Sequence, residues 1–234
     1  MTEPTPTTAT ATATATTLVV GASRGIGLEI CRQLRQRGDR IIAACRTPND
    51  DLERLGANVI GGIDVTCAQS VRELAEQLRS SRLELDWLIH NAGVLARDSL
   101  DDLDFERMTQ QYQVNALGPL RLAQALLPSL RAGSKIGILT SRVGSLGDNT
   151  SGGLYGYRMS KAAANMAGVN LAHDLRERGI AVFMLHPGLV ATEMTDRRGI
   201  APSAAAQGII ARMQQLSLGD SGTFWHAEGH PLPW

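Results

Sequence analysis

The chain has 234 residues, of which 43% are hydrophobic and 20% are charged. This composition is typical of a globular protein, and the length is sufficient for a core that needs neither disulfides nor a structural metal. The 23 basic residues balance the 23 acidic ones, which argues against a nucleic-acid-binding protein and against a polybasic membrane-surface protein. The longest apolar run, residues 180–185, is too short to cross a bilayer.

Three cysteines, Cys31, Cys45 and Cys67, are too few and too widely spaced for a disulfide framework. They fit a reducing compartment, so we expect a cytoplasmic protein. The sequence contains no CxxC, HExxH or carboxylate-rich loop, and we therefore expect no metal.

Residues 2–17 are mostly alternating threonine and alanine, and they lack the basic start and apolar stretch of a secretory signal. We expect residues 1–17 to form a flexible tail. The alternation leaves open that this segment extends the first strand or pairs with a neighbouring chain. No break in composition follows, so we assign residues 18–234 to a single domain.

From residue 18 onward, short apolar runs alternate with helical patterns. We expect strands at residues 18–20, 40–45, 58–61, 86–90, 135–140, 181–186 and 223–226. We expect helices near residues 25–37, 70–80, 105–130, 155–178 and 203–216. Each of the first six strands is continuously apolar, as is typical of strands that are covered on both faces. This order predicts an α/β fold with a doubly wound, mostly parallel sheet and helices on both faces.

The first predicted strand runs directly into a glycine-rich turn and a helix. The turn reads Gly21-Ala22-Ser23-Arg24-Gly25-Ile26-Gly27. Glycines allow a tight turn and a close approach of the backbone to a pyrophosphate at the helix N-terminus, where free N–H groups favour anions. The position of this turn after the first strand favours a dinucleotide site over a plain strand–helix connection.

The end of the second strand predicts which dinucleotide is bound. An acidic residue there would bind the ribose 2′-hydroxyl of NAD, but the chain has Cys45-Arg46 instead. Arg46 can pair with a 2′-phosphate, and Arg24 can approach the same phosphate from the glycine loop. We therefore favour NADP(H) over NAD(H).

Tyr157 and Lys161 lie four residues apart and share one face of a predicted helix. A nearby ammonium favours the phenolate and should lower the pKa of the tyrosine. Tyr157 could then exchange a proton with a carbonyl or alcohol oxygen. Tyr155 has Met159 at the equivalent position and is not a candidate.

These motifs resemble the short-chain dehydrogenase/reductase family from residue 18 to the end of the chain. Besides the glycine loop and Tyr157–Lys161, the matching pieces are Asp64-Val65, Asn91-Ala92-Gly93, Asn115, Ser141, Pro187-Gly188 and Thr192. The polar insertion at residues 147–153 and the ending at residues 221–234 are most similar to small carbonyl reductases and C-factor-like proteins. The resemblance implies a Rossmann-like fold and hydride transfer between a nicotinamide and a carbonyl or alcohol.

The resemblance also implies a catalytic set of Asn115, Ser141, Tyr157 and Lys161. Ser141 would hydrogen-bond the substrate oxygen beside Tyr157. Lys161 would also hold the nicotinamide ribose. Pro119 lacks an N–H and leaves the Asn115 carbonyl without its helical partner, so that this carbonyl could hold the water of the family's proton relay.

The same resemblance extends the cofactor site beyond the glycine loop and Arg46. Tyr157 and Lys161 belong to it as well. The other expected cofactor-binding residues are Asp64, Val65, Asn91, Ala92, Gly93, Pro187, Gly188, Val190 and Thr192. We expect His90 and His186 to be structural.

The expected partners are a small carbonyl or alcohol substrate and a second copy of the chain. The family pairs through the helices predicted at residues 105–130 and 155–178, and we expect a homodimer or homotetramer, with no nucleic acid and no membrane. Two other functions stay open. One is a dinucleotide-binding signalling or regulatory protein of the C-factor type, and the other is a dehydratase or epimerase.

Overall fold

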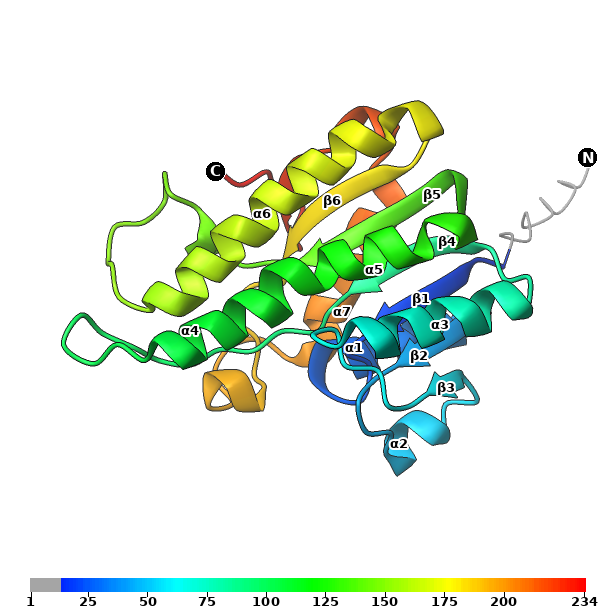
Figure 1. The fold of residues 1–234 in the computed structure, drawn as a ribbon, viewed down its shortest axis with the longest axis horizontal. Coiled ribbons are helices and arrows are strands. Elements are labelled where there is room, and N and C mark those ends of the chain that lie inside the picture. The colour runs from blue at the N-terminus through cyan, green and yellow to red at the C-terminus, as the bar shows by residue number, and fades with distance from the viewer. Residues whose placement is uncertain (1–13) are drawn as a thin grey trace, which may run out of the picture.

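Seven parallel strands form one sheet in the order β3-β2-β1-β4-β5-β6-β7 (Figure 1). The computed structural model describes residues 14–234. The strands are β1 (Thr16–Val20), β2 (Arg40–Ala44), β3 (Asn58–Ile60), β4 (Leu85–His90), β5 (Leu130–Leu139), β6 (Ala181–His186) and β7 (Thr223–His226). Every neighbouring pair is parallel, which confirms the predicted α/β, Rossmann-like architecture.

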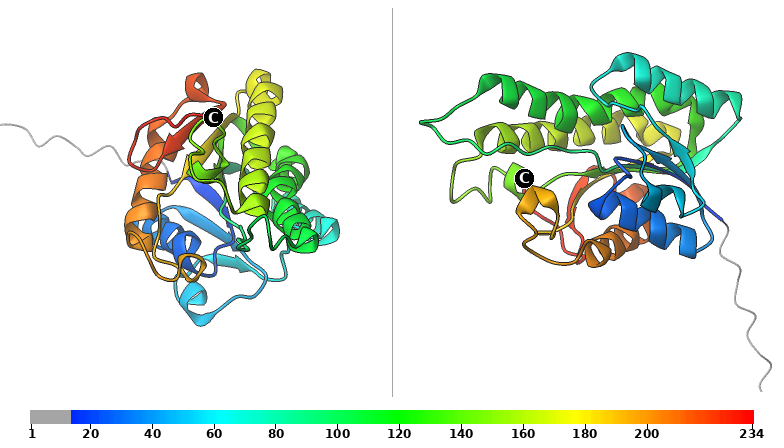
Figure 2. Two further views of the ribbon diagram at one scale, coloured as in Figure 1. Left: turned by 90° about the vertical axis from the view of Figure 1, so that its left-hand side faces the viewer. Right: turned by 90° about the horizontal axis from the view of Figure 1, so that it is seen from below.

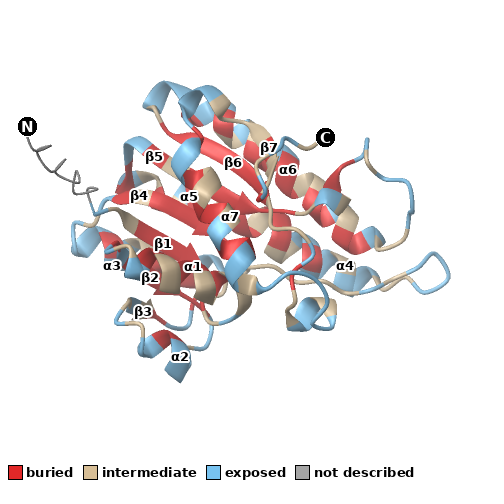
Figure 3. Cartoon of the chain, turned by 180° about the vertical axis from the view of Figure 1, so that it is seen from behind, coloured by how far each residue is buried: buried red, intermediate tan, exposed pale blue. Residues whose placement is uncertain are grey.

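Helices cover both faces of the sheet (Figure 2). On one face lie α1 (Gly25–Gln36) and α7 (Pro202–Gln215). On the other lie α3 (Ala68–Ser80), α4 (Phe105–Tyr112), α5 (Gly118–Leu126) and α6 (Tyr155–Leu175). The strands between the two layers are almost entirely buried (Figure 3), which explains their continuous apolar character. None of the helices within residues 14–234 has the length and apolar character that a membrane crossing requires.

The first strand begins two residues before the predicted domain boundary. Thr16 pairs with Arg40, and Thr17 is fully buried between β2 and β4. Threonine is β-branched and suits a strand, so the end of the alternating segment does extend β1. The rest of the predicted tail, residues 1–13, lies outside the described residues.

The single helix predicted at residues 105–130 is instead several pieces. A π-helical segment, Gln113–Leu117, separates α4 from α5, and a 3₁₀ turn at Leu127–Ser129 follows. Gly118 and Pro119 begin α5. Because Pro119 cannot donate a backbone hydrogen bond, the regular helical ladder is broken before it, and π-helical turns often occur at functional sites.

Two further elements differ from the prediction. Strand β5 begins at Leu130 rather than at residue 135, because an irregular stretch is held to β4 by Ser134, whose hydroxyl donates to the Leu85 carbonyl at 2.6 Å. A short helix, α2 (Asp50–Glu53), was not predicted. It is capped by Asn49, which accepts a hydrogen bond from the Leu52 N–H at 3.0 Å.

The sheet changes its winding direction at β1. The chain proceeds from β1 to β2 and β3 on one side and then returns to β4 on the other side of β1. In open parallel sheets, ligands bind at the carboxyl ends of the strands beside such a switch point. The loops after β1 and β4 therefore mark the place for a site.

Candidate active site

A cleft of about 860 Å³ lies at the carboxyl ends of the strands, around the switch point. Most of the predicted site residues line it. These are Gly21, Ser23, Arg24, Gly25, Ile26, Arg46, Asp64, Val65, Asn91, Ala92, Gly93, Tyr157, Lys161, Pro187 and Thr192. The predicted residues outside the lining are Gly27, Asn115, Ser141, Gly188 and Val190.

The glycine loop is packed too tightly for larger residues. Gly21 has φ +84°, and a Cβ there would lie 2.7 Å from the Ala92 backbone nitrogen. A Cβ on Gly27 would overlap the Gly21 carbonyl oxygen, which itself accepts a hydrogen bond from Asn91 Nδ2 at 2.7 Å. Gly27 thus acts beneath the loop rather than in the cleft. The loop presents backbone and the start of α1 to the cleft, a form that suits a pyrophosphate.

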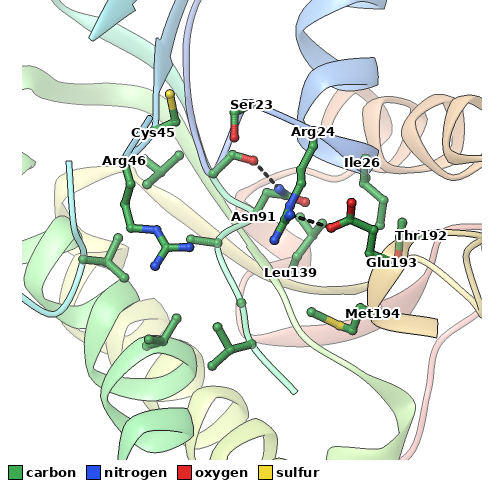
Figure 4. A pocket seen from close by; sticks show the side chains of 18 of the residues that line it. Ser23, Arg24, Ile26, Cys45, Arg46, Asn91, Leu139, Thr192, Glu193 and Met194 are labelled. Atoms are coloured by element: carbon green, nitrogen blue, oxygen red, sulfur yellow. Dashed lines mark hydrogen bonds and ion pairs between the residues drawn. The ribbon is translucent and has the colours of Figure 1, made fainter. Parts of the chain in front are cut away.

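Two arginines extend into the cleft at the end near β2 (Figure 4). Arg46 follows β2, and its charge is one of the causes that hold the pKa of Asp64 below its ordinary value. The larger cause is the Thr66 backbone N–H, which donates to Asp64 Oδ1 at 2.8 Å. Arg24 forms an exposed ion pair with Glu193 at 2.5 Å. Because Glu193 compensates Arg24, Arg46 is the cation among the described residues that is left at this end to meet a phosphate.

Tyr157 lies in the first turn of α6 and is 8% exposed. Burial raises the pKa of Tyr157 to about 12, and hydrogen bonding with Ser141 acts in the opposite direction. Lys161 was expected to lower the pKa of Tyr157, but burial outweighs this effect. The Lys161 ammonium lies 5.7 Å from the centroid of the Tyr157 ring and donates its hydrogen bond to the Leu139 carbonyl. The phenol is consequently held in its protonated form, which is the form of a proton donor.

Lys161 lies one turn after Tyr157, with its ammonium buried beneath the cleft. Lys161 Nζ donates to the Leu139 carbonyl, at the end of β5, at 2.9 Å. Burial lowers the pKa of Lys161 to about 8. Gly93 lies beside this nitrogen and beside Asn115, since a Cβ on Gly93 would lie 3.6 Å from Lys161 Nζ and 3.3 Å from Asn115 Oδ1.

Asn115 lies in the π-helical segment and holds the loop after β4. Its side chain accepts a hydrogen bond from the Val94 N–H and donates to the Val94 carbonyl, both at 2.9 Å. Its Nδ2 also donates to Ser160 Oγ at 2.9 Å, and Ser160 in turn donates to the Tyr157 carbonyl. The Asn115 side chain thus joins α6 to the loop that lines the cleft.

The segment after β6 covers the remaining side of the cleft. Thr192 lines the cleft, and its N–H donates to the Val190 carbonyl at 2.8 Å. A Cβ on Gly25 would lie 3.3 Å from the Thr192 methyl group, so this segment closes directly over the glycine loop. Val190 is buried behind the segment, and Gly188, with φ +87°, makes the turn that follows Pro187.

Several residues of the site were not predicted. Asp98 caps α6 from the loop after β4, accepting hydrogen bonds from the N–H groups of Tyr155 and Gly156, the latter at 2.9 Å. Glu193 and Asn49 line the phosphate end of the cleft. Among these residues, only Ser160 could have been predicted from its neighbours in the sequence, since it stands between Tyr157 and Lys161 on the same helix.

The model of the short chain dehydrogenase family matches residues 15–201. The chain belongs to this family. It is therefore an oxidoreductase of the short-chain dehydrogenase/reductase type, as the motifs predicted.

Among curated proteins, the chain is 48% identical over 222 residues to 1-hydroxy-2-glutathionyl-2-methyl-3-butene dehydrogenase of Rhodococcus sp. strain AD45, covering 93% of this chain and 98% of that protein. It is 42% identical over 154 residues to the C-signal protein of Myxococcus xanthus, covering 64% of this chain and 93% of that protein. Among solved structures, NADPH-bound carbonyl reductase from chicken fatty liver superposes with a TM-score of 0.86 at 30% identity, covering 94% of this chain and 99% of that one. The predicted likeness to carbonyl reductases and to a C-factor-like protein is thereby confirmed.

Proposed function

We propose that this short-chain dehydrogenase is an NADP(H)-dependent enzyme that interconverts a carbonyl compound and its alcohol, with Tyr157 as the general acid/base. The observation that carries the proposal is the place of Tyr157, which lines the same cleft as the glycine loop and Arg46 and hydrogen-bonds with Ser141. Burial of a phenol hydroxyl is costly unless it is hydrogen-bonded, and Ser141 supplies that hydrogen bond.

The residues present fit the cofactor. The glycine loop would hold the pyrophosphate, Arg46 the 2′-phosphate, and Lys161 the nicotinamide ribose. Asn91, Gly93 and Thr192 would border the ring end of the dinucleotide. A bound NADPH supplies the hydride. Tyr157 then donates its proton to the substrate oxygen, Ser141 hydrogen-bonds that oxygen, and the Lys161 ammonium stabilises the phenolate that remains.

Some of the residues that line the cleft bear on the class of substrate. Met194 and Val94 line the cleft with apolar groups, and Arg197 adds one positive charge. The Rhodococcus relative is named for an alcohol that carries a glutathione thioether. We therefore propose a substrate whose alcohol or aldehyde group is attached to an apolar group. A suitable panel of test substrates pairs simple aldehydes with their glutathione-conjugated counterparts.

Arg46 provides the test of the cofactor assignment. Replacing Arg46 by alanine should raise the Kd for NADPH by roughly tenfold to a hundredfold, because a charged hydrogen bond contributes about 1.5–3 kcal/mol. The Kd for NADH should change little. Fluorescence titration of the purified enzyme with each nucleotide measures both values.

Arg54 is the matched control, since it is an exposed arginine directly after α2 that is paired with Asp50 and Asp51. Arg54→Ala should leave both affinities unchanged. The assignment would be contradicted if Arg46→Ala weakened the binding of NADPH and NADH equally. It would also be contradicted if the wild type bound NADH more tightly than NADPH.

The similarity to the C-signal protein supports a second candidate, a cytoplasmic signalling or regulatory protein that binds the dinucleotide. Binding alone would not require a proton donor at the position of Tyr157. Absorbance turnover on the substrate panel separates the two functions. Tight NADPH binding without oxidation of the nucleotide by any substrate would favour the regulatory one.

We also propose that the chain forms a homodimer or homotetramer through α4 and α6. Large apolar side chains are exposed on these helices, namely Phe105, Tyr112, Met159 and Met166. Solvent-exposed apolar side chains of this size favour association between chains. Light scattering at micromolar concentration should give at least twice the mass of one chain, and a monomer mass would contradict this prediction.

A further inference from the structure

A histidine-rich turn follows β7, on the far side of β6 from the glycine loop. The strand ends at His226, and the chain returns at His230, whose carbonyl accepts a hydrogen bond from the His226 N–H at 2.9 Å. Gly229 has φ +104°, and its N–H donates to the His226 carbonyl at 2.9 Å. These bonds fix the backbone of the turn.

The turn brings three groups of metal-binding chemistry together. Side-chain ligand atoms of His226, Glu228 and His230 all lie within 4.8 Å of one another. His226 Nδ1 is 3.6 Å from Glu228 Oε2, and the rings of His226 and His230 stack with centroids 4.7 Å apart. Two imidazoles and a carboxylate form a common donor set for zinc.

The spacing is close to that of a coordinated ion. Bonds of about 2.1 Å around a tetrahedral zinc place its ligand atoms roughly 3.4 Å apart. The pair at 3.6 Å nearly meets this value, and the wider separations can close because Glu228 and His230 are exposed and can rotate. The Glu228 N–H donates to His226 Nδ1 at 3.1 Å and has to release this nitrogen when the nitrogen binds the ion.

A third histidine stands beside the group. His186 ends β6 opposite His226, with the two rings 5.0 Å apart at 78°. His186 Nδ1 is buried and has no hydrogen-bond partner among residues 14–234. A buried polar nitrogen without a partner is costly, and coordination or an ordered water would relieve the cost.

Neighbouring positive charges oppose a cation. Arg142 is close enough to act on both His186 and His226. The Arg212 guanidinium packs under the turn, so that a Cβ on Gly229 would lie 2.6 Å from Arg212 Nη1. Its Nη2 donates to the Gln215 side chain. Glu228 and His230 are exposed, so the donor set is open to solvent on their side.

We propose that the turn from His226 to His230 is a binding site for a divalent transition metal of the zinc class, held by His226, Glu228 and His230, with His186 or water as the fourth ligand. The spacing His-x-Glu-x-His on a turn differs from CxxC, HExxH and carboxylate-rich loops, which is why the sequence predicted no metal. A Cβ on Gly188 would lie 3.7 Å from His226 Nε2, so the proposed site adjoins the loop that follows Pro187.

The test is metal binding by the full chain without a histidine tag. Equilibrium dialysis against Zn²⁺ should give one ion per chain. His230→Ala and Glu228→Ala should each weaken binding by about tenfold or more, since loss even of groups behind the ligands costs 10–100-fold. Zn²⁺ should raise the Tm of the wild type and not that of His230→Ala.

Two control variants separate this site from other metal-binding groups. His173→Ala removes a histidine of α6, and Cys67→Ser removes the exposed thiol. Both should bind zinc as the wild type does. Co²⁺ should give a d–d absorption band without thiolate charge transfer. Unchanged binding by His230→Ala and Glu228→Ala, loss of binding in either control, or no stoichiometric zinc in the wild type would overturn the proposal.

Discussion

Replacing Tyr157 by phenylalanine should lower kcat for carbonyl reduction by about 10²–10⁴-fold, the usual contribution of a positioned proton donor. The substitution removes one hydroxyl from a buried ring that hydrogen-bonds with Ser141. It leaves the apolar packing of α6 in place. The Kd for NADPH should change by less than about tenfold, because at most one hydrogen bond to the cofactor is lost. Steady-state kinetics and nucleotide titration measure the two quantities separately.

Tyr155 provides the matched control for this experiment. It lies on the same helix two residues earlier, its ring is 36% exposed, and its N–H is bound by Asp98 whatever the side chain. Tyr155→Phe should retain the wild-type kcat. A Tyr157→Phe enzyme that keeps most of its rate would remove Tyr157 from its proposed role, even if the cofactor assignment stands.

The parts of the site that could be predicted from the sequence are those that depend on local geometry. The turn from Gly21 to Gly27 is one contiguous segment, and the spacing of Tyr157 and Lys161 follows from the helical repeat. Arg46 directly follows an apolar strand, so its place at the carboxyl edge of the sheet follows from the strand itself. In each case the neighbours that matter are adjacent in the chain.

The parts that were missed depend on contacts between distant segments. The cap of α6 comes from Asp98, 57 residues before Tyr155 in the chain. The partner of Arg24 is Glu193, 169 residues away. The early start of β5 depends on a side chain that bonds across to β4. No periodicity in the sequence reports such pairs.

The pKa of Tyr157 illustrates the same limit. The spacing to Lys161 predicted a lowered pKa, whereas burial dominates and raises it to about 12. Distance along a helix indicates that two side chains are neighbours, but burial depends on everything packed around them. In this structure the Leu139 carbonyl, from a different element, holds the lysine.

Replacing Lys161 by methionine should lower kcat by about two orders of magnitude or more, since the phenolate left after proton donation loses its nearby positive charge. The same substitution should stabilise the fold at pH 7. Burial lowers the pKa of Lys161 from 10.5 to about 8, which corresponds to a cost of about 3 kcal/mol for the buried ammonium. Leaving the Leu139 carbonyl unpaired costs about 1–3 kcal/mol, so the net gain should be about 1 kcal/mol.

The difference in stability between the wild type and Lys161→Met depends on pH and changes sign. Between pH 8 and 10.5 the unfolded chain binds more protons at Lys161 than the folded chain does, so the stability of the wild type rises relative to the variant. The cost of the buried charge is fully present below pH 8 and is relieved as the pH approaches 10.5. Above that range only the lost hydrogen bond remains, and the methionine variant should be the less stable protein. Other titrating groups are common to both chains and cancel in the difference.

Urea unfolding of both proteins across pH 7–10.5 measures the difference directly. The Met variant should be more stable at pH 7, and the order should reverse as the pH rises. In parallel, kcat/KM of the wild type should fall as the pH rises through about 8, where Lys161 of the free enzyme loses its proton, while kcat/KM of Lys161→Met should show no such step. A constant stability difference across this range would mean that Lys161 is not held as a buried cation. Stabilisation of the Tyr157 phenolate by the charge of Lys161 would then be excluded.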